Sequence, residues 1–362
     1  MTPKITYPHM GYMNIPVSNM LRNLGIEVVE APPITKKTVE LGALHSPAEV
    51  CLPYKINMGN FLEGLGEGAN TLVSLCGAGK CRLGFYNTVQ KIALDEYKPL
   101  QFYSINISEN IFPNLYRFLH SVAPHTSKWS IISNIISAIK CLKALDELNC
   151  AKNYFGARTH HSDDIIKIYN SGLKEFSNVS TGQEIHNKKE LILSAMGAIA
   201  DNSDVNPLKV GIIGEFYVLL EPFVNNNIEN RLIRQGVEVK RFVYSGRWVY
   251  ANSLLRALGL YNEEKDYLAQ ARPYLNHHVG GDGLKTVGSA LWCAKNGYDG
   301  IIHVYPFGCM PEVVAQYALQ NLAHDYDLPL LSLSLDEHAS DVGIVTRIEA
   351  FIDCMKRRQH RE

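Results

Sequence analysis

Short apolar runs alternate with helical patterns in three stretches of the chain, residues 5–30, 210–241 and 300–335. Each stretch begins with a strand, continues through a loop and a helix of about three turns, and ends in a second strand. This alternation predicts parallel sheets with helices on both faces. The strands are predicted at 5–7, 26–30, 210–213, 237–241, 300–305 and 328–335, and the helices at 17–24, 223–235 and 312–326.

The region between the first two stretches adds further elements. Strands predicted at 70–75 and 100–105 enclose a helix at 86–96, and isoleucines at helical spacing predict a long helix at 130–148. The polar region that follows is predicted to be helical and ends in the loop-like DNSDVNPLK. We therefore expect two α/β domains, residues 1–203 with a helical segment at about 130–200, and residues 204–362.

Composition narrows the class of protein. The chain has 362 residues and a formal net charge of −1, so it lacks the broad basic surface expected of a nucleic-acid-binding protein. Neither a signal-type apolar segment at the start nor a run of about 20 apolar residues is visible, which predicts a soluble, cytoplasmic protein without membrane contact. Eight cysteines in such a chain indicate buried thiols, a metal site or redox chemistry, because the cytosol keeps thiols reduced.

Two glycine-rich segments resemble nucleotide loops but lack the required pattern. In LCGAGKCRLGFYN, Gly79 and Lys80 are followed by Cys81, where a phosphate-binding loop needs Ser or Thr to hold magnesium. The segment GLGEGAN lacks the third glycine of a dinucleotide fingerprint and precedes a predicted strand instead of following one.

A metal site explains the cysteines of these loops better. Cys76 follows a predicted strand and Cys81 lies five positions later, a spacing that can bring two thiolates to one cluster. Cys51 and Cys309 also lie in loops directly before predicted helices, whose N-termini favour thiolates. The alternatives are zinc, which usually takes close cysteine pairs twice over, and unreactive turn or core cysteines. We assign the unreactive role to the cysteines in predicted helices, Cys141, Cys150, Cys293 and Cys354.

These cysteine segments also resemble a known family. CLPYKINMG, CRLGFYNTVQKIALD, GEFYVLLEPFVNNNIENRLIRQGVEV, YPFGCMPE and DEHASDVGIVTRIEAFID are similar, in this order, to the 2-hydroxyacyl-CoA dehydratase and benzoyl-CoA reductase superfamily, and most closely to its CoA-protein-activase-like branch. The resemblance implies two Rossmann-like domains with an iron–sulfur cluster in the cleft between them. It also implies a separate ATP-hydrolysing activator protein that supplies electrons at low potential.

Carried onto this chain, the resemblance makes Cys51, Cys76, Cys81 and Cys309 the cluster-ligand candidates. Dehydratases of the superfamily typically use three cysteines and leave one iron open, whereas this chain offers four. Four thiolates would suit electron relay, and three would leave a reactive iron. A linked double-cubane cluster would need further ligands, from the helix cysteines or a second subunit, so we expect one [4Fe–4S] cluster per chain.

Charged residues near these cysteines are further candidates. Lys55, Lys80 and Arg82 flank the ligands and could raise the cluster potential or bind a CoA phosphate, or they could be ordinary surface charges. Glu312 could cap the helix that follows Cys309 or donate a proton. His338 follows a predicted strand and could transfer protons near neutral pH.

The leading hypothesis is a reductase or dehydratase component that passes electrons from the activator to a substrate, such as an acyl-CoA, or to a partner subunit in a homo- or heterodimer. The first alternative is a non-catalytic scaffold or binding subunit of a redox complex, stabilised by an iron–sulfur cluster or zinc. The second is a two-domain small-molecule binding protein without a metal.

Overall fold

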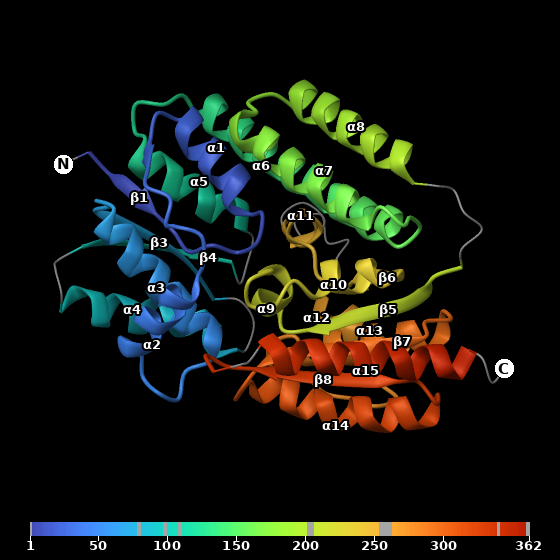
Figure 1. Ribbon diagram of the computed structural model, residues 1–362. Helices are drawn as coiled ribbons and strands as arrows, with labels where there is room; N and C mark the ends of the chain where they lie inside the picture. The colour runs from blue at the N-terminus through green and yellow to red at the C-terminus, as the bar shows by residue number, and fades with distance from the viewer. Residues whose placement is uncertain are drawn as a thin grey trace. The chain divides into compact units, whose positions relative to one another are not determined.

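The computed structural model describes residues 2–77, 81–96, 100–107, 111–200, 206–252, 263–338 and 341–359. The described residues include two four-stranded parallel sheets connected by helices (Figure 1). The chain divides into two compact units with one sheet each. Unit 1 comprises Met1–Asp146, Leu173–Lys188 and Ser245–Tyr261, and unit 2 comprises Glu147–Gly172, Lys189–Tyr244 and Asn262–Glu362.

Helices account for most of the other described residues. Those of unit 1 are α1 (Asn14–Asn23), α2 (Lys36–Leu44), α3 (Leu52–Gly66), α4 (Tyr86–Asp95), α5 (Ile111–Val122) and α11 (Ser245–Tyr250), with the 3-10 helices η1 (Arg82–Phe85) and η2 (Phe176–Asn178). Those of unit 2 are α9 (Phe216–Leu220), α10 (Ile228–Arg234), α12 (Glu263–Ala271), α13 (Gly283–Lys295), α14 (Met310–Asp325) and α15 (Asp341–Gln359). Residues of both units occur in α6 (Lys128–Gly156), α7 (Ser162–Glu175) and α8 (Gly182–Ile199).

The sheet of unit 1 places Cys76 at a favourable edge for ligand binding. Its strands β1 (Lys4–Thr6), β2 (Glu27–Val28), β3 (Thr71–Cys76) and β4 (Gln101–Asn106) pair in the order β2-β1-β3-β4. From β1 the chain continues to β2, which pairs with one edge of β1, and then to β3, which pairs with the opposite edge. Parallel sheets bind ligands outside the carboxyl ends of the strands at such a reversal, and Cys76 ends β3 there.

Helices cover both faces of the unit 1 sheet (Figure 1). Alternate strand residues face opposite sides. Ile5, Val73 and Ile105 pack with residues of α1, α5 and the first half of α6. Leu72 faces the other side and packs with Tyr54 of α3 and with residues of α4. The ends of α3 and α4 that point toward the carboxyl edge of the sheet are therefore fixed by a buried apolar core.

The sheet of unit 2 repeats the same strand order. Its strands β5 (Leu208–Gly214), β6 (Val237–Arg241), β7 (Gly300–Pro306) and β8 (Leu330–Leu335) pair in the order β6-β5-β7-β8. Ile213 and Ile301 pack on one face with residues of α13 and α14. Gly300 faces the other side, where a Cβ atom would lie 2.6 Å from the Phe351 ring of α15. The reversal in this sheet lies between β5 and β7, beside the loop that carries Cys309.

The α/β class and the parallel sheets predicted from the sequence are confirmed. One predicted helix, at 223–235, begins too early, because α9 ends before it at Leu220 and α10 starts only at Ile228. Asn226 and Asn227 lie between them with φ of +57° and +51°. Asparagine is one of the few residues that accept this left-handed conformation readily, so the pair forms a turn within an apolar pattern that is typical of a helix.

The two units are not two successive halves of the chain. The four strands of the unit 1 sheet precede residue 203 and those of the unit 2 sheet follow it, whereas segments from α6 to α11 alternate between the units. Within the described ranges, no helix combines the length and the apolar character needed to cross a membrane.

Candidate functional site

Cys51 is the N-cap residue of α3 in unit 1. Pro53 stands in the first turn of this helix, where proline is well tolerated because its missing N–H needs no partner. Since α3 leads into β3, its N-terminus lies toward the carboxyl edge of the parallel sheet. The Cys51 side chain is buried, and its Sγ lies 2.9 Å from the hydroxyl of Tyr86.

Tyr86 ties the Cys51 segment to the start of α4. The backbone N–H of Cys51 donates to the Tyr86 hydroxyl at 3.3 Å, and the Tyr86 ring packs edge-on against Tyr54 with centroids 4.8 Å apart. Burial, followed by the Cys51 sulfur, raises the pKa of the Tyr86 phenol above its ordinary value. The hydroxyl is therefore a neutral hydrogen-bonding group beside the sulfur.

Cys76 lies at the end of β3, paired in register with Asn106 of β4. Its carbonyl accepts the N–H of Ile107 at 2.9 Å. The chain then turns at Gly77, whose φ of +74° favours glycine. The N–H of Gly77 donates to the carbonyl of Gly84 at 3.0 Å. Burial raises the pKa of the Cys76 thiol.

Cys81 immediately precedes η1 and is half-buried. Its carbonyl accepts the N–H of Gly84 at 3.1 Å. The next residue, Arg82, donates from Nη1 to the carbonyl of Glu49 at 3.2 Å. These bonds, with those of Gly77 and Tyr86, hold together the three backbone segments that carry Cys51, Cys76 and Cys81. Residues 78–80, including the predicted site residue Lys80, lie outside the described residues.

Cys309 occupies the matching place in unit 2, between β7 and α14. It is the N-cap residue of α14, with Pro311 in the first turn, and its carbonyl accepts the N–H of Val313 at 2.9 Å. The Cys309 side chain is 7% exposed, whereas its neighbours Phe307 and Met310 are 70% and 72% exposed. The thiol therefore lies just beneath the surface of unit 2.

Glu312 lies in the first turn of α14 and is fully buried. Its carboxylate accepts from Thr286 Oγ1 at 3.2 Å and lies 2.8 Å from His303 Nε2. Glu312 thus joins α13, β7 and α14 through one carboxylate. Its two suggested roles, helix cap and proton donor, stay predictions. His303 Nδ1 has no hydrogen-bond partner among the described residues.

A second buried acid, Glu215, follows β5 at the same edge of the unit 2 sheet. Its carboxylate accepts the N–H groups of Tyr217 and Val218 at 3.1 and 3.0 Å and so caps α9. Burial raises the pKa of Glu215 to about 8, with further contributions from Asp282 and Glu312. This edge of the sheet therefore carries a carboxyl group that titrates near neutral pH, a property often found at functional sites.

The other predicted site residues occupy different surroundings. Lys55 is buried within α3, one turn after Cys51. Arg82 is exposed. His338 is exposed and follows β8 in unit 2, where its N–H donates to Asp336 Oδ1 at 2.9 Å. The structure thus shows Arg82 tied to the Cys51 segment and Lys55 on the helix that Cys51 begins.

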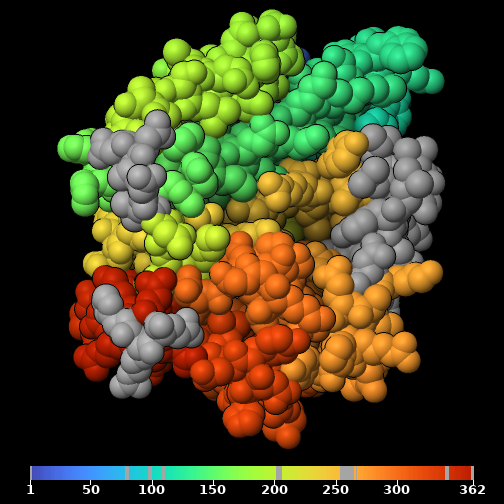
Figure 2. All heavy atoms as spheres, turned by 90° about the vertical axis from the view of Figure 1, so that its right-hand side faces the viewer, coloured from blue at the N-terminus to red at the C-terminus, as the bar shows by residue number. Residues whose placement is uncertain are grey.

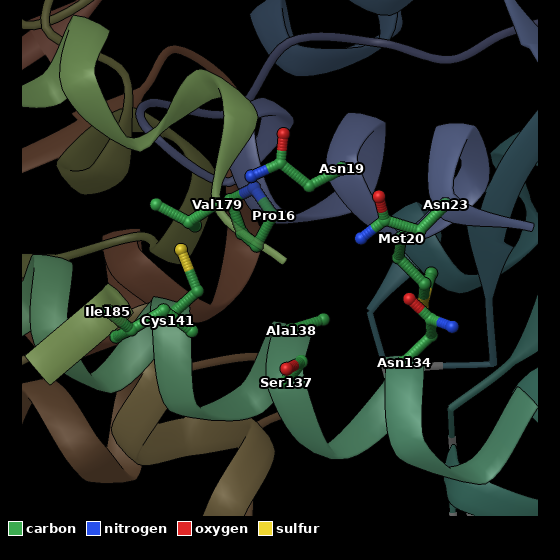
Figure 3. Close-up of a pocket in the computed structure, with 10 residues that line it drawn as sticks. All are labelled: Pro16, Asn19, Met20, Asn23, Asn134, Ser137, Ala138, Cys141, Val179 and Ile185. Atoms are coloured by element: carbon green, nitrogen blue, oxygen red, sulfur yellow. The ribbon is translucent and has the colours of Figure 1, made fainter. Parts of the chain in front are cut away.

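Two of the cysteines predicted to be unreactive have the surroundings of core residues. Cys141 lines a cavity of about 10 Å³ in unit 1, large enough for at most one water molecule (Figure 3). Cys293 packs so closely on the sheet of unit 2 that a Cβ atom on Gly211 would lie 2.5 Å from its sulfur. Burial raises the pKa of both thiols to about 12, so they stay protonated at neutral pH.

The donors at the unit 1 edge fit an iron–sulfur cluster in their chemistry. All eight cysteines lie among the described residues and outside disulfide bonds, and three of them belong to segments joined by hydrogen bonds at one end of the sheet. Thiolate sulfur is the ligand that such clusters require. In the described part of the chain, no three His, Cys, Asp or Glu side chains gather at metal-ligating distances. Binding would therefore have to draw the thiols together.

Sequence reasoning missed three residues at these edges, Tyr86, His303 and Glu215. Glu215 directly follows a strand and precedes a helix, a position that would have justified its selection. His303 interrupts the apolar strand GIIHVYP, which is a weaker signal. Nothing local marks Tyr86, because its contact with Cys51 spans 35 residues of sequence.

The fold and these residues define an α/β protein of two parallel-sheet units with cysteines at the carboxyl ends of both sheets. Comparison of the chain with protein-family models found no match, and comparison with curated proteins found none either. The resemblance to the 2-hydroxyacyl-CoA dehydratase superfamily therefore stays a prediction.

Proposed function

We propose that the chain is an iron–sulfur component of the reductase or dehydratase type that holds one [4Fe–4S] cluster. The observation that carries this proposal is the set of three cysteines at the carboxyl edge of the unit 1 sheet, on segments tied together by Tyr86, Arg82 and Gly77. Cys51, Cys76 and Cys81 are the ligands from unit 1, and Cys309 is the fourth ligand. A cluster shared by cysteines of both domains is thus part of the proposal.

The roles of the chain's residues follow from their positions. The thiolates bind iron, and the cluster they hold supplies one-electron transfer at low potential. Lys80 and Arg82 flank Cys81 in the sequence, and their positive charges would stabilise the reduced cluster, which is more negative than the oxidised one. Lys55 adds a buried cation one helical turn from Cys51. Glu312, bonded to His303, and the exposed His338 are the candidates for proton transfer.

Partners and substrate also belong to the proposal. An ATP-hydrolysing activator protein donates the electrons, and an acyl-CoA or a related subunit accepts them, as the family resemblance implies. A groove of about 330 Å³ in unit 1 favours the proposal of a small-molecule substrate. It is lined by Arg117, a cation suited to phosphate or carboxylate, and by Asn106, the register partner of Cys76. Cysteines outside disulfide bonds suit a cytoplasmic location.

Single cysteine replacements test the ligand assignment. Cys76→Ser and Cys309→Ser should each lower the iron bound after anaerobic reconstitution severalfold, because serine replaces a soft thiolate with a poor ligand for iron. Cys293→Ser is the matched control, since that thiol packs against Gly211 in the core and should cost stability without removing iron. Equal iron content in all three variants would contradict the assignment.

The competing function is a metal-stabilised scaffold or binding subunit without catalysis. Exposed apolar side chains on α14 favour it, since Met310 and Tyr317 are each 72% exposed on a helix that reaches the surface of unit 2, orange-red in Figure 2. Reduction of the cluster absorbance that depends on activator and ATP would support the reductase role. A cluster that the activator never reduces would support the scaffold.

A further inference from the structure

Tyr86 and Cys51 form a hydrogen-bonded pair in the interior of unit 1. The Tyr86 hydroxyl lies 2.9 Å from Cys51 Sγ, and the Tyr86 side chain is 5% exposed. Little water can compete for the sulfur at this point. Hydrogen bonds in such surroundings are electrostatically stronger than those at the surface.

The direction of this hydrogen bond follows from the groups involved. A thiol and a phenol can each donate to the other, but a thiolate that binds iron has no hydrogen and can only accept. The phenol oxygen already accepts the backbone N–H of Cys51 at 3.3 Å. That bond draws electron density from the hydroxyl and makes its O–H a better donor. With Cys51 as a ligand, Tyr86 must therefore donate to the sulfur.

The position of Tyr86 is fixed by packing that does not involve the sulfur. Its ring meets the Tyr54 ring edge-on, with centroids 4.8 Å apart and an interplanar angle of 84°. Both rings belong to the apolar cluster beneath the sheet, together with Phe61 and Leu72. The ring packing therefore holds the hydroxyl beside Cys51, independently of the bond to the sulfur.

We propose that Tyr86 is a positioning residue that donates a hydrogen bond to the Cys51 thiolate and thereby raises the reduction potential of the cluster that Cys51 helps to hold. The inference rests on the proposed function, because it takes Cys51 as a ligand. One added electron makes the cluster and its thiolates more negative. A donor to a ligand sulfur stabilises this reduced state more than the oxidised one.

The test compares Tyr86→Phe with Tyr54→Phe in the full chain. Tyr86→Phe removes the hydroxyl and keeps the ring. Tyr54→Phe is the matched control, because it removes a buried hydroxyl that has no hydrogen-bond partner among the described residues, on the ring that packs against Tyr86. Iron content and circular dichroism establish that each variant is folded and loaded.

The reduction potential is measured by EPR during anaerobic titration with Ti(III) citrate, which gives one electron per cluster and becomes Ti(IV). At a fixed potential, the ratio of reduced to oxidised cluster should fall about tenfold in Tyr86→Phe, which corresponds to about 59 mV for one electron. The potential of Tyr54→Phe should equal that of the wild type.

Three results would overturn the inference. Equal potentials in Tyr86→Phe and the wild type would show that the hydroxyl does not act on the cluster. Equal shifts in both variants would assign the effect to packing. Loss of iron from Tyr86→Phe alone would make Tyr86 an assembly residue. Each leaves the proposed function standing, whereas a wild-type chain without iron would overturn both.

Discussion

Glu215 is a buried acid at the end of β5 whose two carboxylate oxygens cap α9. The strand reaches it through Gly214, where φ is +134° and a Cβ atom would lie 1.9 Å from the carbonyl oxygen of Val304. A glycine is therefore needed to bring the acid this close to β7. Burial is the main reason that the pKa of Glu215 rises from 4.5 to about 8.

Glu215→Gln should change how stability depends on pH. Between pH 4.5 and about pH 8 the folded protein holds a proton that the unfolded chain has lost, so the free energy of unfolding falls as pH rises through this window. Each pH unit should cost up to about 1.4 kcal/mol. Glutamine does not titrate, so the variant should lose less stability than the wild type between pH 5.5 and pH 8.5.

Urea unfolding of both proteins at these two pH values measures the difference. Glutamine replaces one capping acceptor with an amide donor, which shifts stability equally at both pH values and leaves the comparison intact. Parallel pH dependence in the two proteins would contradict a raised pKa for Glu215.

The positions of individual candidate residues were predictable where the neighbouring sequence defines them. Cys76 and Cys309 follow apolar strands and precede helices, and strand ends in parallel sheets point to ligand sites. The partners of these residues were not predictable. Glu312 meets Thr286 and His303 only because α13, β7 and α14 pack together in three dimensions.

At the scale of elements, a buried ion cluster joins α6, α10 and β6 within unit 2. Glu229 of α10 lies 3.1 Å from Lys152 Nζ and 3.3 Å from Arg241 Nη1. Asn149 Nδ2 donates to the same carboxylate at 3.0 Å. Burial pushes the pKa of Glu229 upward, but Arg241, Lys152 and the hydrogen bonds outweigh it and hold the pKa at about 2. The carboxylate is thus charged at every physiological pH.

Glu229→Gln should destabilise unit 2 by about 3–5 kcal/mol, because it leaves the charges of Lys152 and Arg241 buried without their counter-ion. Chemical unfolding at pH 7 measures the loss. Lys167→Ala, which breaks an exposed pair with Asp164, is the control and should leave the unfolding midpoint nearly unchanged. A small effect of Glu229→Gln, no larger than that of the control, would contradict the role of the cluster.

Helices and strands whose ends are marked by a glycine turn were predicted most accurately. The strand predicted at 237–241 matches β6, which follows Gly236 in a left-handed turn with φ of +72°. The helix predicted at 223–235 starts only at Ile228, because Asn226 and Asn227 adopt positive φ inside the apolar pattern. Periodicity reports which side chains are buried, and it does not report a two-residue change in backbone conformation.

At the scale of the whole molecule, one strand order occurs twice. Each sheet places its first strand beside its third, and a cysteine lies at or just after the end of each third strand, Cys76 in unit 1 and Cys309 in unit 2. The two parallel sheets followed from the alternation of strands and helices in the sequence. The alternation of the segments from α6 to α11 between the two units could not be predicted, because it depends on long-range packing that no local pattern encodes.

The measurement that tests the central claim most directly is the count of iron and acid-labile sulfide per chain after strictly anoxic purification. An EPR spectrum after reduction completes it. One [4Fe–4S] cluster predicts about four of each per chain and a paramagnetic signal on one-electron reduction. A chain that holds no iron after anaerobic reconstitution, or one zinc in its place, would leave the α/β fold intact and contradict the proposed redox function.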